Sequence, residues 1–333
     1  MARVGLRTAR IAVFASLTSL CTVSFGFQED GPLISSVPRV RNVRTADLAS
    51  RLPADLRVDV PLVLIPAHVT NSRGASVTNL TRENFRLFED NIEQKITYFS
   101  KEDAPISIGL LVDASGSMSH KIRKSAEAAA AFFRTANPGD EFFLIEFNDH
   151  PRLVVPFTSD SNLIYNKIVR ARPFGRTSLL DALRVSLTQM KKARNLRKAI
   201  VILSDGGDNC SRYTEREVKR IMVEADVQVY AMGIFGSDSF RNRTPEEING
   251  PHLLTELAEE SGGKHFPVER LDDLPGICTR IGNELRNQYL LGYIPVNSER
   301  DAKYRHVKVL LVAPAGAPQL AVYHRQGYYA PAQ

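Results

Sequence analysis

The apolar positions of the chain change their spacing twice, and these changes divide it into three parts. In residues 57–104 apolar and polar residues alternate, a pattern that predicts strands. The same alternation returns in residues 288–330, for example at Val307, Val309 and Leu311. Neither segment is long enough to enclose a core by itself. We therefore expect the two segments to pair with each other in one small β-rich domain.

The middle part, residues 105–287, alternates between apolar runs and stretches with helical spacing. Residues 106–112 and 199–203 are apolar runs without charge, typical of strands covered on both faces. Residues 119–136 and 179–190 place their apolar side chains on one face of a helix, and further helices are expected over residues 253–260 and 274–286. Strands and helices in alternation predict an α/β fold, a doubly wound and mostly parallel sheet with helices on both faces.

The first residues of the sequence have the pattern of a secretory leader. Three arginines precede an apolar stretch, residues 11–25, that carries no charge. We interpret residues 1–26 as a signal peptide and residues 27–56, which lack periodicity, as a flexible lead-in. An uncleaved anchor is the alternative. No later stretch has membrane-spanning length, so we expect an exported protein without a stable span after cleavage, in the periplasm, at the cell surface or secreted.

Charge and cysteine content exclude several classes of function. The chain has 43 basic and 37 acidic residues, and removing the three leader arginines lowers the net charge from +6 to +3, 40 against 37. No cluster of Lys and Arg interleaved with aromatic residues occurs, so we expect no nucleic-acid partner. No Cys-x-x-Cys motif occurs, so a zinc or redox site is not supported.

The first apolar run ends in oxygen donors. Asp113, Ser115 and Ser117 follow it at every second position, and Gly116 allows a sharp turn between them. Ligands of α/β sheets bind at the carboxyl ends of the strands. Hard oxygens without His or Cys favour Mg²⁺, Mn²⁺ or Ca²⁺. The alternative is an ordinary turn followed by a helix N-cap.

Two later stretches bring the same chemistry to the same edge. Thr177 precedes the helical stretch 179–190, and Asp205 follows the apolar run 199–203 and begins an Asp-Gly pair. Each also has a simpler explanation, since Thr is a common N-cap and Asp-Gly is a common turn.

Together these residues resemble the metal-ion-dependent adhesion site of von Willebrand factor type A domains. The five residues that match it in order are Asp113, Ser115, Ser117, Thr177 and Asp205. The resemblance covers about residues 105–287, and the β-rich flanks resemble those of bacterial exported proteins with such a domain. It implies that the three hydroxyls ligate a divalent ion and that the two carboxylates bind it directly or through waters. It also implies Mg²⁺, with Mn²⁺ or Ca²⁺ as alternatives, and a partner protein that presents a carboxylate to the ion.

Further residues of the predicted loops have two explanations each. Glu146, Asp149 and Asp208 either orient the site through waters or are solvated loop acids. The loop of residues 235–251 is expected to border the site.

We therefore expect an exported, metal-dependent protein-binding module and not an enzyme. The sequence has no Gly-x-Ser-x-Gly elbow, no His-Glu-x-x-His and no phosphate loop. One alternative is a structural or accessory subunit of an envelope complex whose metal site only stabilises it. The other is a hydrolase whose catalytic part is unrecognised.

Overall fold

The computed structural model of the chain describes residues 62–101, 103–235, 245–312 and 319–332. The predicted leader 1–26 and lead-in 27–56 lie outside these residues, as does most of the loop 235–251. Within the described residues, no helix is both long enough and apolar enough to cross a bilayer.

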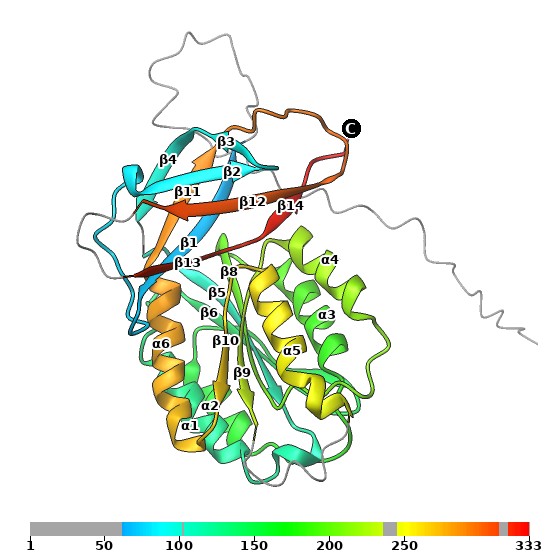
Figure 1. Cartoon of the computed structure of the whole chain (residues 1–333). Coiled ribbons are helices and arrows are strands. Elements are labelled where there is room, and N and C mark those ends of the chain that lie inside the picture. The colour runs from blue at the N-terminus through cyan, green and yellow to red at the C-terminus, as the bar shows by residue number, and fades with distance from the viewer. Residues whose placement is uncertain (1–61, 102, 236–244, 313–318, 333) are drawn as a thin grey trace, which may run out of the picture. The chain divides into compact units, whose positions relative to one another are not determined.

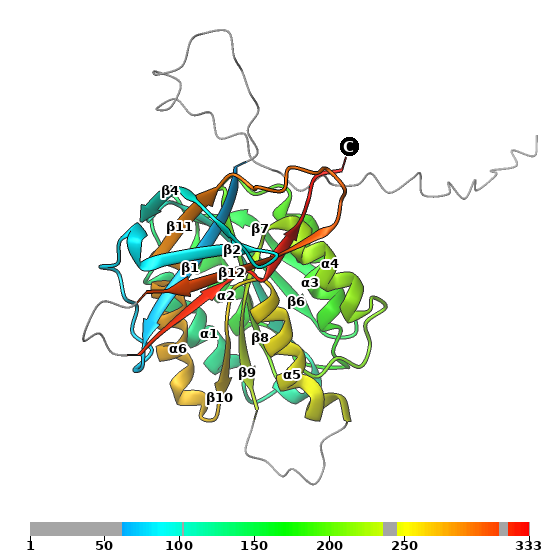
Figure 2. The same ribbon diagram turned by 45° about the horizontal axis from the view of Figure 1, so that its top comes forward.

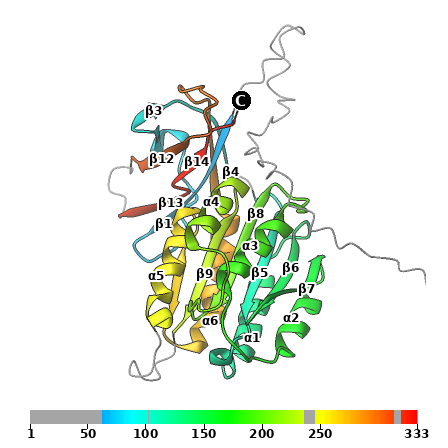
Figure 3. The same ribbon diagram turned by 90° about the vertical axis from the view of Figure 1, so that its right-hand side faces the viewer.

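The middle of the chain forms a six-stranded sheet in the order β10-β9-β8-β5-β6-β7. Figure 3 shows β8, β5, β6 and β7 side by side. All neighbours are parallel except the edge strand β7, which is antiparallel to β6. The strands are β5 (Ile106–Asp113), β6 (Glu141–Phe147), β7 (Pro151–Thr158), β8 (Arg197–Ser204), β9 (Gln228–Ile234) and β10 (His265–Val268).

Three helices cover each face of this sheet (Figure 1). One face carries α1 (Ile122–Phe133), α2 (Ser161–Val169) and α6 (Leu274–Arg286), and the other carries α3 (Leu179–Met190), α4 (Glu215–Ala225) and α5 (Pro245–Glu260). The predicted fold class, a doubly wound and mostly parallel α/β sheet, is confirmed.

The central strand β5 shows why its residues 106–112 carry no charge. All eight of its residues are buried. Ile108 and Leu110 pack into the core on one face of the sheet, and Leu111 packs into the core on the other. Gly109 is required by a close approach, because a Cβ at this position would lie 2.3 Å from the ring of Phe143.

The segments before and after the α/β domain pair with each other in two four-stranded antiparallel sheets (Figure 2). Their orders are β13-β1-β11-β4 and β14-β12-β2-β3. The inner side chains of both sheets share one hydrophobic core. The strands are β1 (Val63–Asn71), β2 (Phe85–Glu89), β3 (Ile92–Gln94), β4 (Ile96–Lys101), β11 (Gln288–Tyr293), β12 (Tyr304–Leu311), β13 (Leu320–His324) and β14 (Gly327–Tyr329).

Short 3₁₀ turns lie between some of these elements, and one helix is longer than the sequence pattern predicts. The turns are η2 (Arg82–Asn84), η3 (Gly116–Met118) and η5 (Leu271–Asp273). Helix α5 begins at Pro245, eight residues before the predicted start at Leu253, and contains Pro251. The pair Gly250-Pro251 is typical of a turn. In the structure, however, Gly250 packs against the backbone of Gly206. The residues around Gly250 are helical, although the local pattern predicts no helix there.

The β-rich part contacts the amino edge of the α/β sheet, where the parallel strands begin. Arg197, the first residue of β8, donates to the carbonyl of Ala104 and to the side chain of Gln288, both at 3.1 Å. Gln288 in turn donates to Gln228, the first residue of β9, at 2.8 Å. The carboxyl edge lies one strand length away, about 25 Å for eight residues.

Candidate metal centre

Asp113 ends β5 and organises the first loop of the carboxyl edge. Its carboxylate is fully buried and accepts a hydrogen bond of 2.8 Å from the backbone N–H of Ser115. This local bond turns the chain so that the hydroxyls of Ser115 and Ser117 lie 3.1 Å apart. The sequence-predicted trio is therefore assembled within one turn.

Ser204, which the sequence analysis did not single out, connects this loop to the one that carries Asp205. Its hydroxyl donates to the second oxygen of Asp113 at 2.6 Å and accepts from the N–H of Gly206 at 3.0 Å. Gly206 has φ +80°, and a Cβ there would lie 2.8 Å from the backbone of Gly250. The signal available in the sequence was a hydroxyl at the last position of a buried strand, directly before the acid.

Thr177 reaches the same edge through its loop. The N–H of Gly116 donates to the carbonyl of Gly175 at 3.1 Å, which joins the first and second loops. The N–H of Thr177 donates to the side chain of Asn209 at 2.9 Å, which joins the second and third. Thr177 is buried, and these two hydrogen bonds hold its loop beside the first and the third.

The three additional loop acids form local contacts. Asp208 accepts from the N–H of Leu180 at 2.8 Å, at the beginning of α3, and Asp149 accepts from the N–H of Arg176 at 2.9 Å. Glu146 is buried and pairs with Arg152 at 2.9 Å on the neighbouring strand. Asp208 and Asp149 thus hold the loop that carries Thr177 rather than being freely solvated.

Two carboxylates lie close together at this edge with little to neutralise them. Burial raises the pKa of Asp113 well above its usual range, and the charge of Asp205 raises it further. The nearest cation is Lys121, whose ammonium lies 3.6 Å from Asp205 and donates to the carbonyl of Ile234 at 3.1 Å. Both side chains are almost entirely buried. Lys121 was not predicted, since nothing in its local pattern distinguishes it from other lysines at helix starts.

The donors present at this edge fit a hard divalent cation. The described residues contain no group of three or more His, Cys, Asp or Glu side chains that could hold a metal, so an ion here needs the hydroxyls as well as the two acids. Carboxylates and neutral hydroxyls suit Mg²⁺, with Mn²⁺ or Ca²⁺ as alternatives, and do not suit Zn²⁺ or Cu²⁺. A cation would also relieve the repulsion that raises the pKa of Asp113. Ligation by the five residues stays a prediction.

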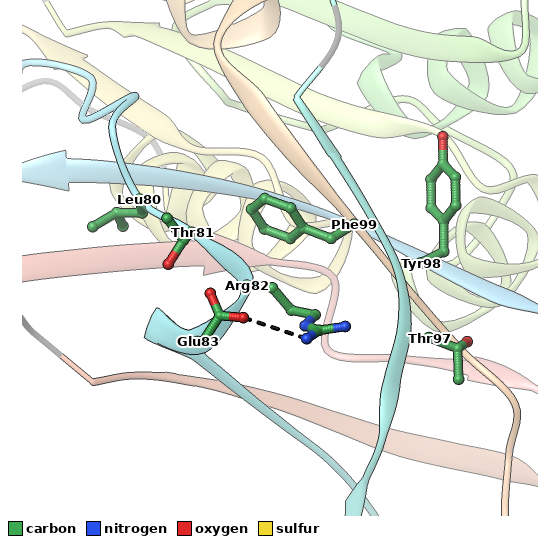
Figure 4. Close-up of a pocket in the computed structure, with 7 residues that line it drawn as sticks. All are labelled: Leu80, Thr81, Arg82, Glu83, Thr97, Tyr98 and Phe99. Carbon is green, nitrogen blue, oxygen red and sulfur yellow. Dashed lines mark hydrogen bonds and ion pairs between the residues drawn. The ribbon is translucent and has the colours of Figure 1, made fainter.

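The β-rich part has a hollow of about 550 Å³ in volume (Figure 4). It lies between η2 and β4, and its lining includes Tyr98 and Phe99. Its two charged residues, Arg82 and Glu83, pair with each other at 3.3 Å and are more than half exposed. Their charges cancel, so this hollow lacks the convergent polar groups of a specific ligand site.

Comparison with known families agrees with the geometry of the α/β part. Residues 108–207 match the family model described as von Willebrand factor type A domain. This part of the chain is similar to von Willebrand factor type A domains. The matched residues include the five predicted site residues on the three loops of the carboxyl edge. They make up slightly less than a third of the sequence, so the match does not extend to the β-rich part.

Individual relatives are distant. An uncharacterized protein of Borreliella burgdorferi is 24% identical over 186 residues, which cover 50% of this chain and 54% of that protein. The chain thus spans about half the length of this curated relative. A solved structure named von Willebrand factor type A, from Catenulispora acidiphila, is 12% identical with a TM-score of 0.46 and covers 74% of this chain and 76% of that one.

An aerotolerance-related membrane protein from Bacteroides fragilis is 18% identical with a TM-score of 0.43, covering 54% of this chain and 99% of that one. At such similarity the role of a relative does not carry over to this chain, since one fold supports many functions. The function must be argued from the residues of the site.

Proposed function

We propose that the chain is an exported protein-binding module that uses a divalent cation, Mg²⁺ before Mn²⁺ or Ca²⁺, to bind an acidic group of a partner protein. One observation supports this most directly: two buried carboxylates lie beside three hydroxyls at the carboxyl edge, and no described arginine neutralises them. The hydroxyls of Ser115, Ser117 and Thr177 and the carboxylates of Asp113 and Asp205 would hold the ion.

The ion would supply a coordination position that a carboxylate from another protein can fill. Two carboxylates balance the charge of a divalent cation, and Mg²⁺ keeps octahedral geometry with waters in its remaining positions. Ser117 is exposed whereas the four other residues are buried, so the site opens to solvent on the side of Ser117. The chain's own residues position the ion, and the open side admits the partner.

Lys121 favours an exchangeable ion over a purely structural one. Its ammonium partly neutralises Asp205, so the three loops can keep their arrangement without an ion. The β-rich part contacts the opposite edge of the sheet, so an ion at the carboxyl edge does not hold the two parts of the chain together. These observations favour a binding role over the structural or accessory alternative.

The first test measures Mg²⁺ binding by titration calorimetry. We expect Asp205→Asn to weaken binding by about 100-fold, because it removes one of two carboxylates and leaves the hydrogen bond from Ser204 to Asp113 intact. The matched control is Asp272→Asn, which changes an exposed acid paired with Lys124 outside the site. Equal Mg²⁺ affinity in the wild type and in Asp205→Asn would reject the metal site.

The second test concerns the partner. The immobilised chain is exposed to envelope and culture-fluid proteins of its own source in Mg²⁺ and in EDTA, with Asp113→Ala as control. We expect proteins that are retained only in Mg²⁺ and only by the wild type. Retention that ignores both EDTA and the substitution would assign binding to the β-rich part and leave the ion a structural role.

A further inference from the structure

A basic groove lies beside the proposed metal site. It is a hollow of about 880 Å³ between the β6–β7 hairpin and the loop that connects α2 to α3. Its charged lining includes Arg152 from the hairpin, Lys167 from α2, and Arg170 and Arg172 from the connecting loop. Three of these cations lie within residues 167–172, and the fold places Arg152 of the hairpin beside them.

The groove is continuous with the loops that would hold the ion. Ala114, which lies between Asp113 and Ser115 in the sequence, lines the groove. Its carbonyl accepts a hydrogen bond of 2.9 Å from the N–H of Phe174, another lining residue three positions before Thr177. A molecule that occupies the groove therefore lies next to the residues that approach the ion.

The charges of the groove are mostly not neutralised by the protein itself. Arg152 pairs with the buried Glu146, and its side chain stays 75% exposed. Lys167, Arg170 and Arg172 are exposed, and none of them forms an ion pair with a described residue. Four cations therefore face one carboxylate in this groove, which makes it a surface for an anionic ligand.

We propose that the basic groove binds an acidic peptide segment of the partner protein, next to the carboxylate that approaches the ion. This inference rests on the proposed function, because it extends the same contact. Guanidinium groups form paired hydrogen bonds with carboxylates, so three arginines suit a run of Asp or Glu side chains. Phe174, 59% exposed, adds an apolar contact at the lip. The positive field also speeds association with an acidic partner.

A nucleic acid fits the groove less well. Proteins that bind single strands stack successive bases on several aromatic side chains. Among the described lining residues, Phe174 is the only Phe or Tyr. The peptide is therefore the ligand that the lining favours, and an oligonucleotide serves as a competitor in the test.

The test measures binding of fluorescein-labelled decaglutamate by anisotropy at low ionic strength in Mg²⁺. We expect the double variant Arg170→Glu/Arg172→Glu to bind the peptide at least about tenfold more weakly, with steep weakening by salt in the wild type. Its Mg²⁺ affinity by calorimetry should remain that of the wild type, which also shows that the fold persists. The control, Lys191→Glu/Lys192→Glu, makes the same charge change on exposed residues at the end of α3 and should change peptide binding less than about twofold.

Separate outcomes test the groove assignment, the choice of ligand and the metal-dependent function. Equal weakening by both double variants, or no weakening by the groove variant, would overturn the groove assignment even if EDTA abolishes binding and the metal site stands. Tighter binding of oligothymidylate than of decaglutamate would overturn the choice of ligand. If Mg²⁺ fails to bind and the groove variant alone loses the peptide, the groove stands and the metal-dependent function fails.

Discussion

Both edges of the central sheet contain buried acids, but the acids of the two edges have different partners. At the amino edge Asp140 accepts hydrogen bonds from Arg286, and Glu141 accepts from Arg194 at 2.8 Å. Asp140 also accepts from the N–H of Ile106 at 2.9 Å, at the beginning of β5. The hydrogen bonds of these two acids hold the beginnings of the strands together.

At the carboxyl edge the protein only partly compensates the negative charges of the acids. Asp113 accepts only neutral donors, and Asp205 has one lysine at 3.6 Å. The comparison shows that burial of a carboxylate does not by itself indicate a site. A site requires an acid whose charge the protein leaves partly uncompensated, beside donors that are free to bind. Ser115 and Ser117 bring hydroxyls beside Asp113, and Ser117 is exposed.

The largest predicted effect is at the amino edge. Arg286→Met leaves the fully buried Asp140 without its arginine, and removing one partner of a buried ion pair destabilises a protein by about 3–5 kcal/mol. Urea denaturation measures this loss. Mg²⁺ affinity should not change, because Arg286 lies one strand length from the metal loops. A loss below about 1 kcal/mol would show that the arginine is not needed to balance Asp140.

A second prediction concerns Glu284, an acid of the amino edge that has no arginine partner at hydrogen-bond distance. Burial raises its pKa to about 7, although Lys264 and Arg280 oppose the shift, and one of its oxygens has no hydrogen-bond partner. Its neighbour at 3.6 Å is His68, whose pKa burial lowers to about 4. The histidine is therefore neutral at pH 7 and cannot balance the carboxylate.

The direction of the pH effect follows from the raised pKa. Below about pH 4.5 the carboxyl is protonated in both states and Glu284→Gln should have little effect on stability. Between about pH 4.5 and pH 7 the wild type loses stability as the pH rises, because the carboxyl ionises in the unfolded chain but stays protonated in the native protein. Above pH 7 the variant should be more stable than the wild type by about 3 kcal/mol, because each unit by which the native pKa exceeds the unfolded pKa corresponds to about 1.4 kcal/mol. Denaturation at pH 4 and pH 8 measures this, and equal differences at both values would contradict it.

The smallest predicted effect concerns Lys121, the cation that pairs with Asp205. Lys121→Met removes a positive charge 3.6 Å from Asp205, and Mg²⁺ should then bind about tenfold more tightly because one repulsive charge is gone. The metal-free protein should become less stable at the same time. The control is Lys124→Met, which changes a half-buried lysine in the first turn of α1 and should leave Mg²⁺ affinity unchanged. Weaker Mg²⁺ binding by Lys121→Met would show that the lysine orders Asp205 rather than competing with the ion.

The sequence by itself determined much of the fold. The uncharged run of residues 106–112 predicts a doubly covered strand, and all eight residues of β5 are buried. Helices α3 and α6 begin and end at the predicted residues, because their apolar spacing reflects the one face that each buries. The oxygen donors of Asp113, Ser115 and Ser117 were also visible, since they follow the strand directly.

Only the tertiary structure decided which charges meet. Lys121 and Asp205 are far apart in the sequence, and their contact depends on β5 and β8 being neighbours in the sheet. The basic groove likewise needs the β6–β7 hairpin beside the α2–α3 loop. The physical reason is that local spacing records how each side chain is buried, whereas the partner of a charge is set by which elements the crossover connections bring together.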